Sequence, residues 1–140
     1  MVELLEALTN AEKPRNQATF REILRDEKSL VYLPRHYVIH TVGPIWNGGR
    51  NREEELLANC YFNSMKLARD NGIRSIAFPS ISTGVYSFPV ELAAKIAVRT
   101  VARFLQENPG QFDLVEWVLF DSHTESVYEA EVTLYYNIRI

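Results

Sequence analysis

The stretch that decides the fold is IRSIAFPSISTGVYSFP, residues 73–89. It begins as an apolar β-strand, breaks at Pro79, continues through small and hydroxyl residues, and enters a helix behind Pro89. A helix N-terminus offers free backbone N–H groups and about half a positive charge, and small residues let those groups approach a phosphate. Tyr86 adds aromatic surface for a sugar or base. This order is typical of an anion site, and equally of an ordinary connection with Gly84 at a turn.

Further strands and helices flank this stretch on both sides. Residues 36–42, HYVIHTV, predict a strand with apolar residues at both parities, as expected for burial on both faces. Residues 52–70 predict an amphipathic helix whose acidic run 53–55 indicates a solvated first turn. Residues 89–107 predict a helix with a charged outer stripe, and residues 114–120, LVEWVLF, predict another strand. The order predicts parallel strands joined by helices, with ligands at the carboxyl ends of the strands.

Polar loops gather at that edge of the sheet. The three loops are residues 43–50, 79–88 and 120–124. The nearby side chains with acid–base chemistry are Asp121, His123 and His40, and no spacing singles one out as catalytic. Three histidines and one cysteine are scattered along the chain. Without metal-ligand spacing, a Walker pattern or GxGxxG, we expect neither a metal nor a cofactor.

The ends of the chain carry no chemical motif. Residues 17–26, QATFREILRD, have apolar residues at helical spacing and predict part of a helical segment over 1–32. Residues 124–131 predict a short helix. The tail 132–140, VTLYYNIRI, has β character, and as an edge strand it would be open to pairing with another chain. We therefore expect one domain, 1–140, with a homodimer through the edge as one outcome.

Composition narrows the classes of function. The 140 residues are 46% apolar, enough for the core of one domain. The net charge of −3 comes from 15 basic and 18 acidic residues without a basic block, so we expect no general nucleic-acid binding. The single cysteine, Cys60, excludes an internal disulfide and fits a reducing compartment. No apolar run approaches the roughly 18 residues of a membrane span, and no signal-peptide pattern is present, so we expect a soluble cytoplasmic protein.

Two segments resemble the second half of a macro domain: YVIHTVGPIW at 37–46 and LLANCYFNSMKLARDNGIRSIAFPSISTGVYSFP at 56–89. The HTVGP strand end and the FPSISTGVY loop occur together at the family's spacing. The resemblance covers about residues 33–130, which leaves a strand-like tail over 131–140. It implies a three-layer α/β/α fold, a mostly parallel sheet with helices on both faces, shortened at its N-terminus.

The resemblance also implies a ligand and a site. Macro domains bind ADP-ribose, and several hydrolyse ADP-ribosyl esters or O-acetyl-ADP-ribose. By that similarity the loop would wrap the pyrophosphate through backbone N–H groups, Tyr86 would lie against the distal ribose, and Phe120 and Asp121 would border the adenosine end. Pro79 and Ser80 would shape the floor. The ligand-binding residues so implied are Ser80, Ile81, Ser82, Thr83, Gly84, Val85, Tyr86, Phe120 and Asp121.

The first part of the chain departs from the family. The family's acidic residue that reads adenine, its asparagine-rich stretch and its glycine-rich loop before the catalytic helix are not found in residues 1–32, which contain no glycine. This removes half of the expected cleft and some central strands. The exposed sheet edge would need a cover, for which residues 1–26, the tail 132–140 or a second copy of the chain are candidates.

Three functions follow from these observations. The first is a module that binds ADP-ribose, a related nucleotide diphosphate or an ADP-ribosylated protein, and the intact loop favours it. The second is an ADP-ribosyl ester hydrolase or O-acetyl-ADP-ribose deacetylase, for which the family's usual catalytic loop is absent. The third is a dimerising scaffold that binds no ligand.

Overall fold

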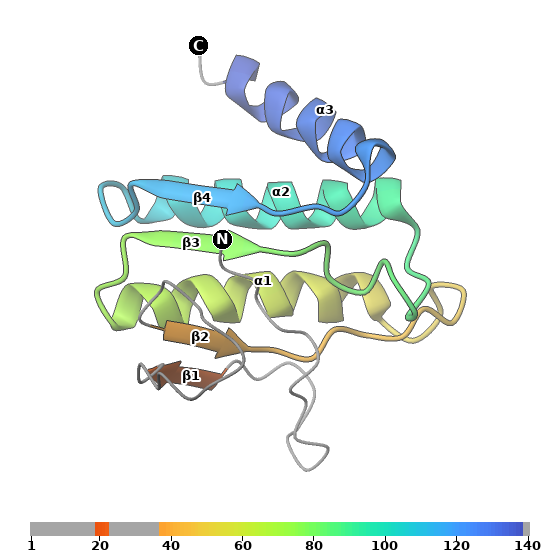
Figure 1. The fold of residues 1–140 in the computed structure, drawn as a ribbon, viewed down its shortest axis with the longest axis horizontal. Helices are drawn as coiled ribbons and strands as arrows, with labels where there is room; N and C mark the ends of the chain where they lie inside the picture. Colours follow the sequence, from red (N-terminus) through yellow and green to blue (C-terminus); the bar gives the residue numbers. More distant parts are fainter. Residues whose placement is uncertain (1–18, 23–36, 139–140) are drawn as a thin grey trace, which may run out of the picture.

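The computed structural model describes residues 19–22 and 37–138 of the chain (Figure 1). Strands and helices alternate over most of this length. The elements are β1 Thr19–Glu22, β2 Tyr37–His40, α1 Glu53–Asp70, β3 Ser75–Phe78, α2 Val90–Glu107, β4 Leu114–Trp117 and α3 Ser122–Ile138. Helices α1 and α2 pack against each other, and α3 packs against α2. Figure 1 shows α1 and α2 running along the strands, with α3 beside α2 at one end of the layer.

The strands form two pairs. β3 and β4 are parallel, with Ile76 opposite Val115 and Phe78 opposite Trp117. Parallel neighbours need a crossover connection, and α2 supplies it. β1 and β2 are antiparallel, and among the described strands the two pairs are not hydrogen-bonded to each other. The predicted α/β architecture with parallel strands joined by helices is therefore confirmed for β3, α2 and β4.

The predicted helix over 17–26 is wrong for the four residues that the structure describes there. Thr19–Glu22 is a strand paired along its whole length with β2. A stretch this short fits either period, so the neighbouring strand decides its conformation. The rest of the helical segment predicted over 1–32 lies outside the described residues.

The strand predicted over the tail 132–140 is also wrong as far as the structure describes it. Helix α3 continues to Ile138, well beyond the short helix predicted over 124–131. Its buried or half-buried residues recur at helical spacing along the side that meets the core. They are Thr124, Val127, Tyr128, Glu131 and Tyr135. Packing of this stripe outweighs the β preference of the tail's branched and aromatic residues, and it removes the strand edge that suggested a homodimer.

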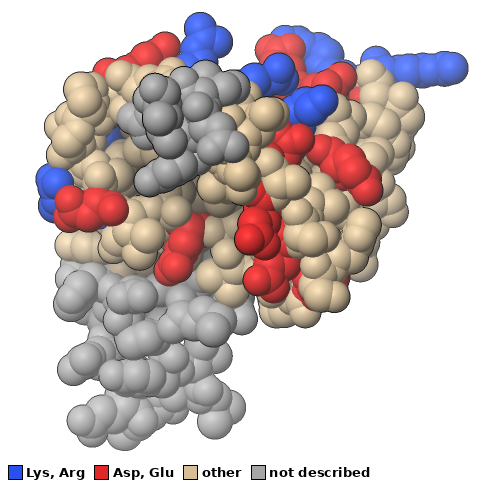
Figure 2. Space-filling model, turned by 90° about the horizontal axis from the view of Figure 1, so that it is seen from above, with Lys and Arg blue, Asp and Glu red and all other residues tan. Residues whose placement is uncertain are grey.

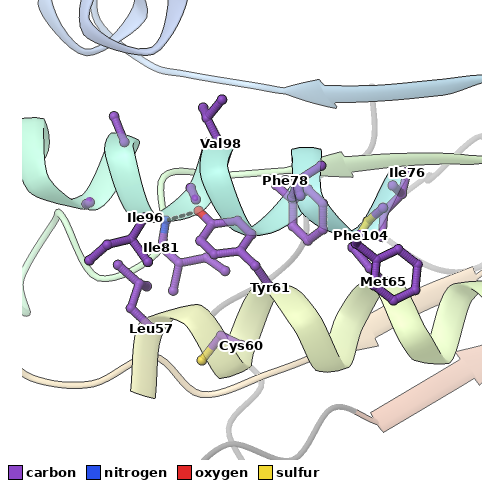
Figure 3. Packing of buried hydrophobic residues seen from close by; sticks show 14 of the residues in the cluster. Leu57, Cys60, Tyr61, Met65, Ile76, Phe78, Ile81, Ile96, Val98 and Phe104 are labelled. Atoms are coloured by element: carbon purple, nitrogen blue, oxygen red, sulfur yellow. Dashed lines mark hydrogen bonds between the residues drawn. The ribbon is translucent and has the colours of Figure 1, made fainter. Parts of the chain in front are cut away.

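The core lies where α1 and α2 meet the β3 strand (Figure 3). The predicted inward stripe of α1 is buried throughout: Leu57, Cys60, Tyr61, Ser64 and Ala68. The ring of Tyr61 meets Phe78 edge-on at 5.0 Å between centroids. Cys60 is buried, as predicted, and its thiol donates a hydrogen bond to the carbonyl of Val42 at 3.2 Å. Within residues 19–22 and 37–138 no helix has the length and hydropathy of a membrane span.

Candidate functional site

The loop 79–88 joins the end of β3 to the start of α2, and the buried Tyr61 holds its beginning. The hydroxyl of Tyr61 donates to the carbonyl of Pro79 at 3.3 Å and accepts the N–H of Ile81 at 3.3 Å (Figure 3). Burial raises the pKa of Tyr61 well above its ordinary value, so the hydroxyl keeps the proton that it donates. The first residues of the loop are therefore fixed to α1.

A chain of hydroxyl groups ties the next part of the loop to α3. The hydroxyl of Thr83 is 2.7 Å from the hydroxyl of Ser80 and also donates to its carbonyl at 3.1 Å. The Ser80 hydroxyl in turn shares a hydrogen bond of 2.8 Å with the hydroxyl of Tyr128. Ser80 and Ile81 therefore lie in the floor of the loop, with Ile81 in the hydrophobic core.

Two serines, and not the glycine, carry the unusual backbone conformation of the loop. Ser82 and Ser87 have φ angles of 67° and 60°, in the left-handed region that costs roughly 1–2 kcal/mol for a residue with a β-carbon. The carbonyl of Ser82 accepts a hydrogen bond from the N–H of Phe88 at 2.9 Å, and the carbonyl of Gly84 accepts one from the N–H of Ser87 at 3.0 Å. These two hydrogen bonds close the loop. The interpretation of Gly84 as a turn requiring glycine is wrong, since its φ lies outside that region.

The outer part of the loop presents backbone donors. In the part of the chain that the structure describes, no protein group accepts a hydrogen bond from the N–H of Thr83, Gly84, Val85 or Tyr86. Gly84 is exposed, and Val85 is 96% exposed. A β-carbon at Gly84 would have no atom within 4 Å. Successive open N–H groups on a small-residue loop can take water or an anion.

A second loop, after β2, packs against the first. A β-carbon at Gly43 would lie 2.6 Å from Cγ2 of Ile81 and closer still to the hydroxyl of Ser82, so only glycine allows this approach. The N–H of Trp46 donates to the carbonyl of Tyr86 at 2.8 Å. The ring of Trp46 lies 4.8 Å from that of Phe88. The two loops therefore form one unit at the carboxyl ends of β2 and β3.

Glu53, the first residue of α1, holds this second loop. Its side chain is 1% exposed, and its carboxylate accepts the N–H groups of Asn47 at 3.0 Å, Gly49 at 2.6 Å and Asn51 at 2.5 Å. The prediction of a solvated first turn is therefore wrong for Glu53. An acidic residue at a helix start fits a solvated end equally well, so the sequence held no signal that this one turns inward.

We expect Glu53→Gln to destabilise the protein by several degrees in Tm near neutral pH and to flatten the acid side of its stability profile. Burial raises the pKa of the Glu53 carboxyl, but the hydrogen bonds from Asn47, Asn51 and Gly49 outweigh burial and hold the pKa below its ordinary value. A carboxyl group whose pKa is lowered by folding stabilises the protein when the pH is above its pKa in the unfolded chain. This contribution is lost as the pH falls through the pKa of the folded state. Thermal melts between about pH 7 and pH 3, where the group titrates, measure the effect.

The matched control is Glu54→Gln, because Glu54 is the exposed neighbour in the same helical turn. Removal of its charge leaves the loop contacts intact, so its profile should follow that of the wild type. If the two variants lose stability in parallel at every pH, the buried carboxylate does not anchor the loop.

The candidate acid–base residues have structural partners. Asp121 caps α3: its carboxylate accepts the N–H of Thr124 at 2.7 Å and the Thr124 hydroxyl at 3.0 Å. These bonds hold the pKa of Asp121 below its ordinary value. His123 is exposed with Nε2 3.6 Å from Glu91, and His40 lies in β2. Asp121, His123 and His40 therefore do not share one partner: Asp121 binds Thr124, His123 lies near Glu91, and His40 lies on another element.

The charges around the site do not favour an anion. Glu91 lies in the first turn of α2, where the helix dipole would otherwise attract a phosphate. Figure 2 shows acidic side chains in a band across the middle of one face, with most of the basic side chains along its upper edge. An anion at the loop would therefore depend on the backbone N–H groups. Among the described residues no cluster of three His, Cys, Asp or Glu side chains is placed to hold a metal.

The structure separates the predicted site residues into three groups. Ser80, Ile81 and Ser82 form the floor, and Ser82 is buried beside Gly43. The outer residues are Thr83, Gly84, Val85 and Tyr86. Phe120, 86% exposed, and Asp121 lie at the start of α3. Gly43 and Tyr128, which support the loop 79–88, and Glu53, which holds the loop after β2, were not predicted from the sequence.

Comparison with known proteins identifies the family to which the chain is similar. A model of the macro domain family matches residues 27–97. The chain is 58% identical over 97 residues to an uncharacterised protein of Fusobacterium nucleatum, covering 69% of this chain and 55% of that protein. It is 52% identical over 104 residues to an O-acetyl-ADP-ribose deacetylase of Klebsiella pneumoniae, covering 74% and 58% of the two chains. The Oceanobacillus iheyensis macrodomain solved with ADPR matches 91% of this chain, with 43% identity and a TM-score of 0.75.

The matches leave part of each relative without a counterpart. The chain spans 55–58% of the two curated relatives and 63% of the Oceanobacillus iheyensis structure. The family model, over residues 27–97, includes the loop 79–88, all of α1 and the first part of α2.

Proposed function

Because this chain belongs to the macro domain family, we propose that it binds ADP-ribose and holds the diphosphate on the backbone N–H groups of Thr83, Gly84, Val85 and Tyr86. One observation carries the proposal: these four consecutive donors are unpaired within the described residues, on a loop where the N–H groups of Ile81, Ser87 and Phe88 are hydrogen-bonded. Such donors match the oxygens of a diphosphate, and no basic side chain is needed to hold it.

The hydrogen bonds that hold the loop support the same function. Tyr61, Ser80 and the paired carbonyls of Ser82 and Gly84 hold it closed before any ligand arrives. A preformed site loses less conformational entropy on binding than a loop that must order around its ligand. The Oceanobacillus iheyensis macrodomain, a relative at 43% identity, was solved with ADPR.

The ends of the ligand are assigned to the remaining predicted residues. We place the distal ribose against Tyr86 and the adenosine end near Phe120 and Asp121, with Ser80, Ile81 and Ser82 as the floor. Phe120 exposes most of its ring, which suits contact with a base or sugar. Free ADP-ribose and ADP-ribose attached to a protein share this chemistry. We propose the cytoplasm as its compartment, because Cys60 is the single cysteine of the chain and fits a reducing environment.

Titration calorimetry with ADP-ribose, with AMP and inorganic phosphate as controls, tests the proposal. We expect micromolar binding that prefers ADP-ribose over both controls, because only the intact ligand spans the loop and the α3 end of the site. No heat at millimolar ADP-ribose would refute the proposal and favour a scaffold without ligand.

A hydrolase or deacetylase is the second candidate, favoured by the name of the Klebsiella pneumoniae relative. The carboxylate of Asp121 is engaged by Thr124 and its pKa is lowered, which makes it a poor proton donor. We therefore propose binding without turnover. Release of ADP-ribose from a modified protein should equal that of a no-protein control; release that is lost in Asp121→Ala would instead establish the enzyme.

A further inference from the structure

Tyr128 of α3 is the most deeply placed member of the hydroxyl chain beneath the loop. It is 2% exposed, and its ring lies 5.8 Å from that of Trp117 in β4. Its hydroxyl reaches the Ser80 hydroxyl at 2.8 Å, across 48 residues of sequence. This bond connects the body of the C-terminal helix to the proposed anion loop.

The chain of hydroxyl groups ends at Thr83, which also carries the first of the open N–H groups. The Thr83 hydroxyl donates to the carbonyl of Ser80 and lies 2.7 Å from the Ser80 hydroxyl, which holds its side chain beside Ser80. The backbone N–H of the same residue begins the row of four donors. Hydrogen bonds in such a chain polarise and strengthen one another, so removal of the buried end weakens the exposed end.

We propose that Tyr128 is a positioning residue for the anion loop: it acts through Ser80 on Thr83 and so sets the affinity for the diphosphate. This inference rests on the proposed function and adds α3 to the binding site, although Tyr128 makes its contact beneath the loop. A loop held in its binding conformation pays less of the ordering cost when the ligand arrives.

Tyr128→Phe tests this role, because it removes one hydroxyl and leaves the ring in the core. We expect ADP-ribose affinity to fall by about two- to tenfold, the range for loss of the hydrogen bond to Ser80. Tyr135→Phe is the matched control: it lies on the same helix, is half-buried, and its hydroxyl makes no hydrogen bond within the described residues. Equal affinity in Tyr128→Phe and wild type would overturn the proposal.

A double-mutant cycle separates positioning from general destabilisation. If Tyr128 acts through Ser80, the double variant Tyr128→Phe with Ser80→Ala should bind no more weakly than the weaker single variant. Fully additive losses would show that the two hydroxyl groups act independently, against the proposal. Thermal melts of all three variants show how much of any loss follows stability alone.

Amide hydrogen exchange in the ligand-free protein gives a readout that does not need ADP-ribose. The N–H groups of Ser87 and Phe88 close the loop, so their exchange should quicken in Tyr128→Phe and in Ser80→Ala, but not in Tyr135→Phe. If the wild type fails to bind ADP-ribose, the proposed function is refuted. The exchange experiment still tests whether the Tyr128–Ser80 hydrogen bond holds the loop. Unchanged exchange rates in both variants would show that the Tyr128–Ser80 hydrogen bond does not hold the loop.

Discussion

Gly84→Glu is expected to abolish ADP-ribose binding and leave the fold intact. A β-carbon at this position meets no atom within 4 Å, and its φ lies outside the left-handed region, so the backbone accepts a side chain. The new carboxylate would occupy the space in front of the open N–H groups. Two like charges about 5 Å apart near a protein surface repel by about 3 kcal/mol, which corresponds to roughly a hundredfold loss of affinity.

Gly84→Gln is the matched control, because glutamine has nearly the same size and no charge. It should lose much less affinity than Gly84→Glu, and both variants should keep the circular dichroism spectrum and the Tm of the wild type. Calorimetry with ADP-ribose measures the difference. If Gly84→Glu binds ADP-ribose with wild-type affinity, the ligand does not bind at this loop.

Gly43→Val should cause the largest loss of stability among the changes considered, and binding should be lost with it. The first added carbon would lie within 2.6 Å of Cγ2 of Ile81 and still closer to the hydroxyl of Ser82. Ile81 is in the core and Ser82 is buried in a left-handed conformation, so neither can move away cheaply. Overpacking of this kind costs about 1–3 kcal/mol. Urea denaturation gives the stability change, and calorimetry gives the affinity.

Gly84→Ala provides the comparison for Gly43→Val, since a single β-carbon there meets open space. Its stability and affinity should stay close to those of the wild type. A Gly43→Val protein with unchanged urea midpoint would mean that the loops after β2 and β3 do not pack as closely as the structure places them.

The helices α1 and α2 and the loop between β3 and α2 follow from local pattern. Leu57, Cys60 and Tyr61 repeat at helical spacing over a length that only a helix can fill, and α1 ends within one residue of the predicted bounds. α2 is equally periodic, and Pro89 precedes its first residue. Between them the run from Pro79 to Phe88 has too many small and polar residues to continue either element, so the loop between a strand and a helix was predictable.

The short and terminal elements do not follow from local pattern. Thr19–Glu22 takes its conformation from the backbone of β2, and the tail takes its helix from packing on α2. Both segments have residues that suit a strand and a helix about equally well. Their neighbours in space decide between the two.

The sequence by itself determined an α/β core and a loop of small residues at the carboxyl end of β3, because periodicity and chain breakers act over a few residues. Only the tertiary structure decided what holds that loop and its neighbour after β2: Gly43 lies against Ser82, Tyr128 lies beneath Ser80, and Glu53 turns inward onto the loop after β2. The contacts of Gly43 with Ser82 and of Tyr128 with Ser80 join residues far apart in the chain, whereas Glu53 binds residues near it in sequence and has the ordinary look of an acidic helix start. The physical reason is that a hydrogen bond or a close approach depends on distance in space, which spacing in the sequence does not encode.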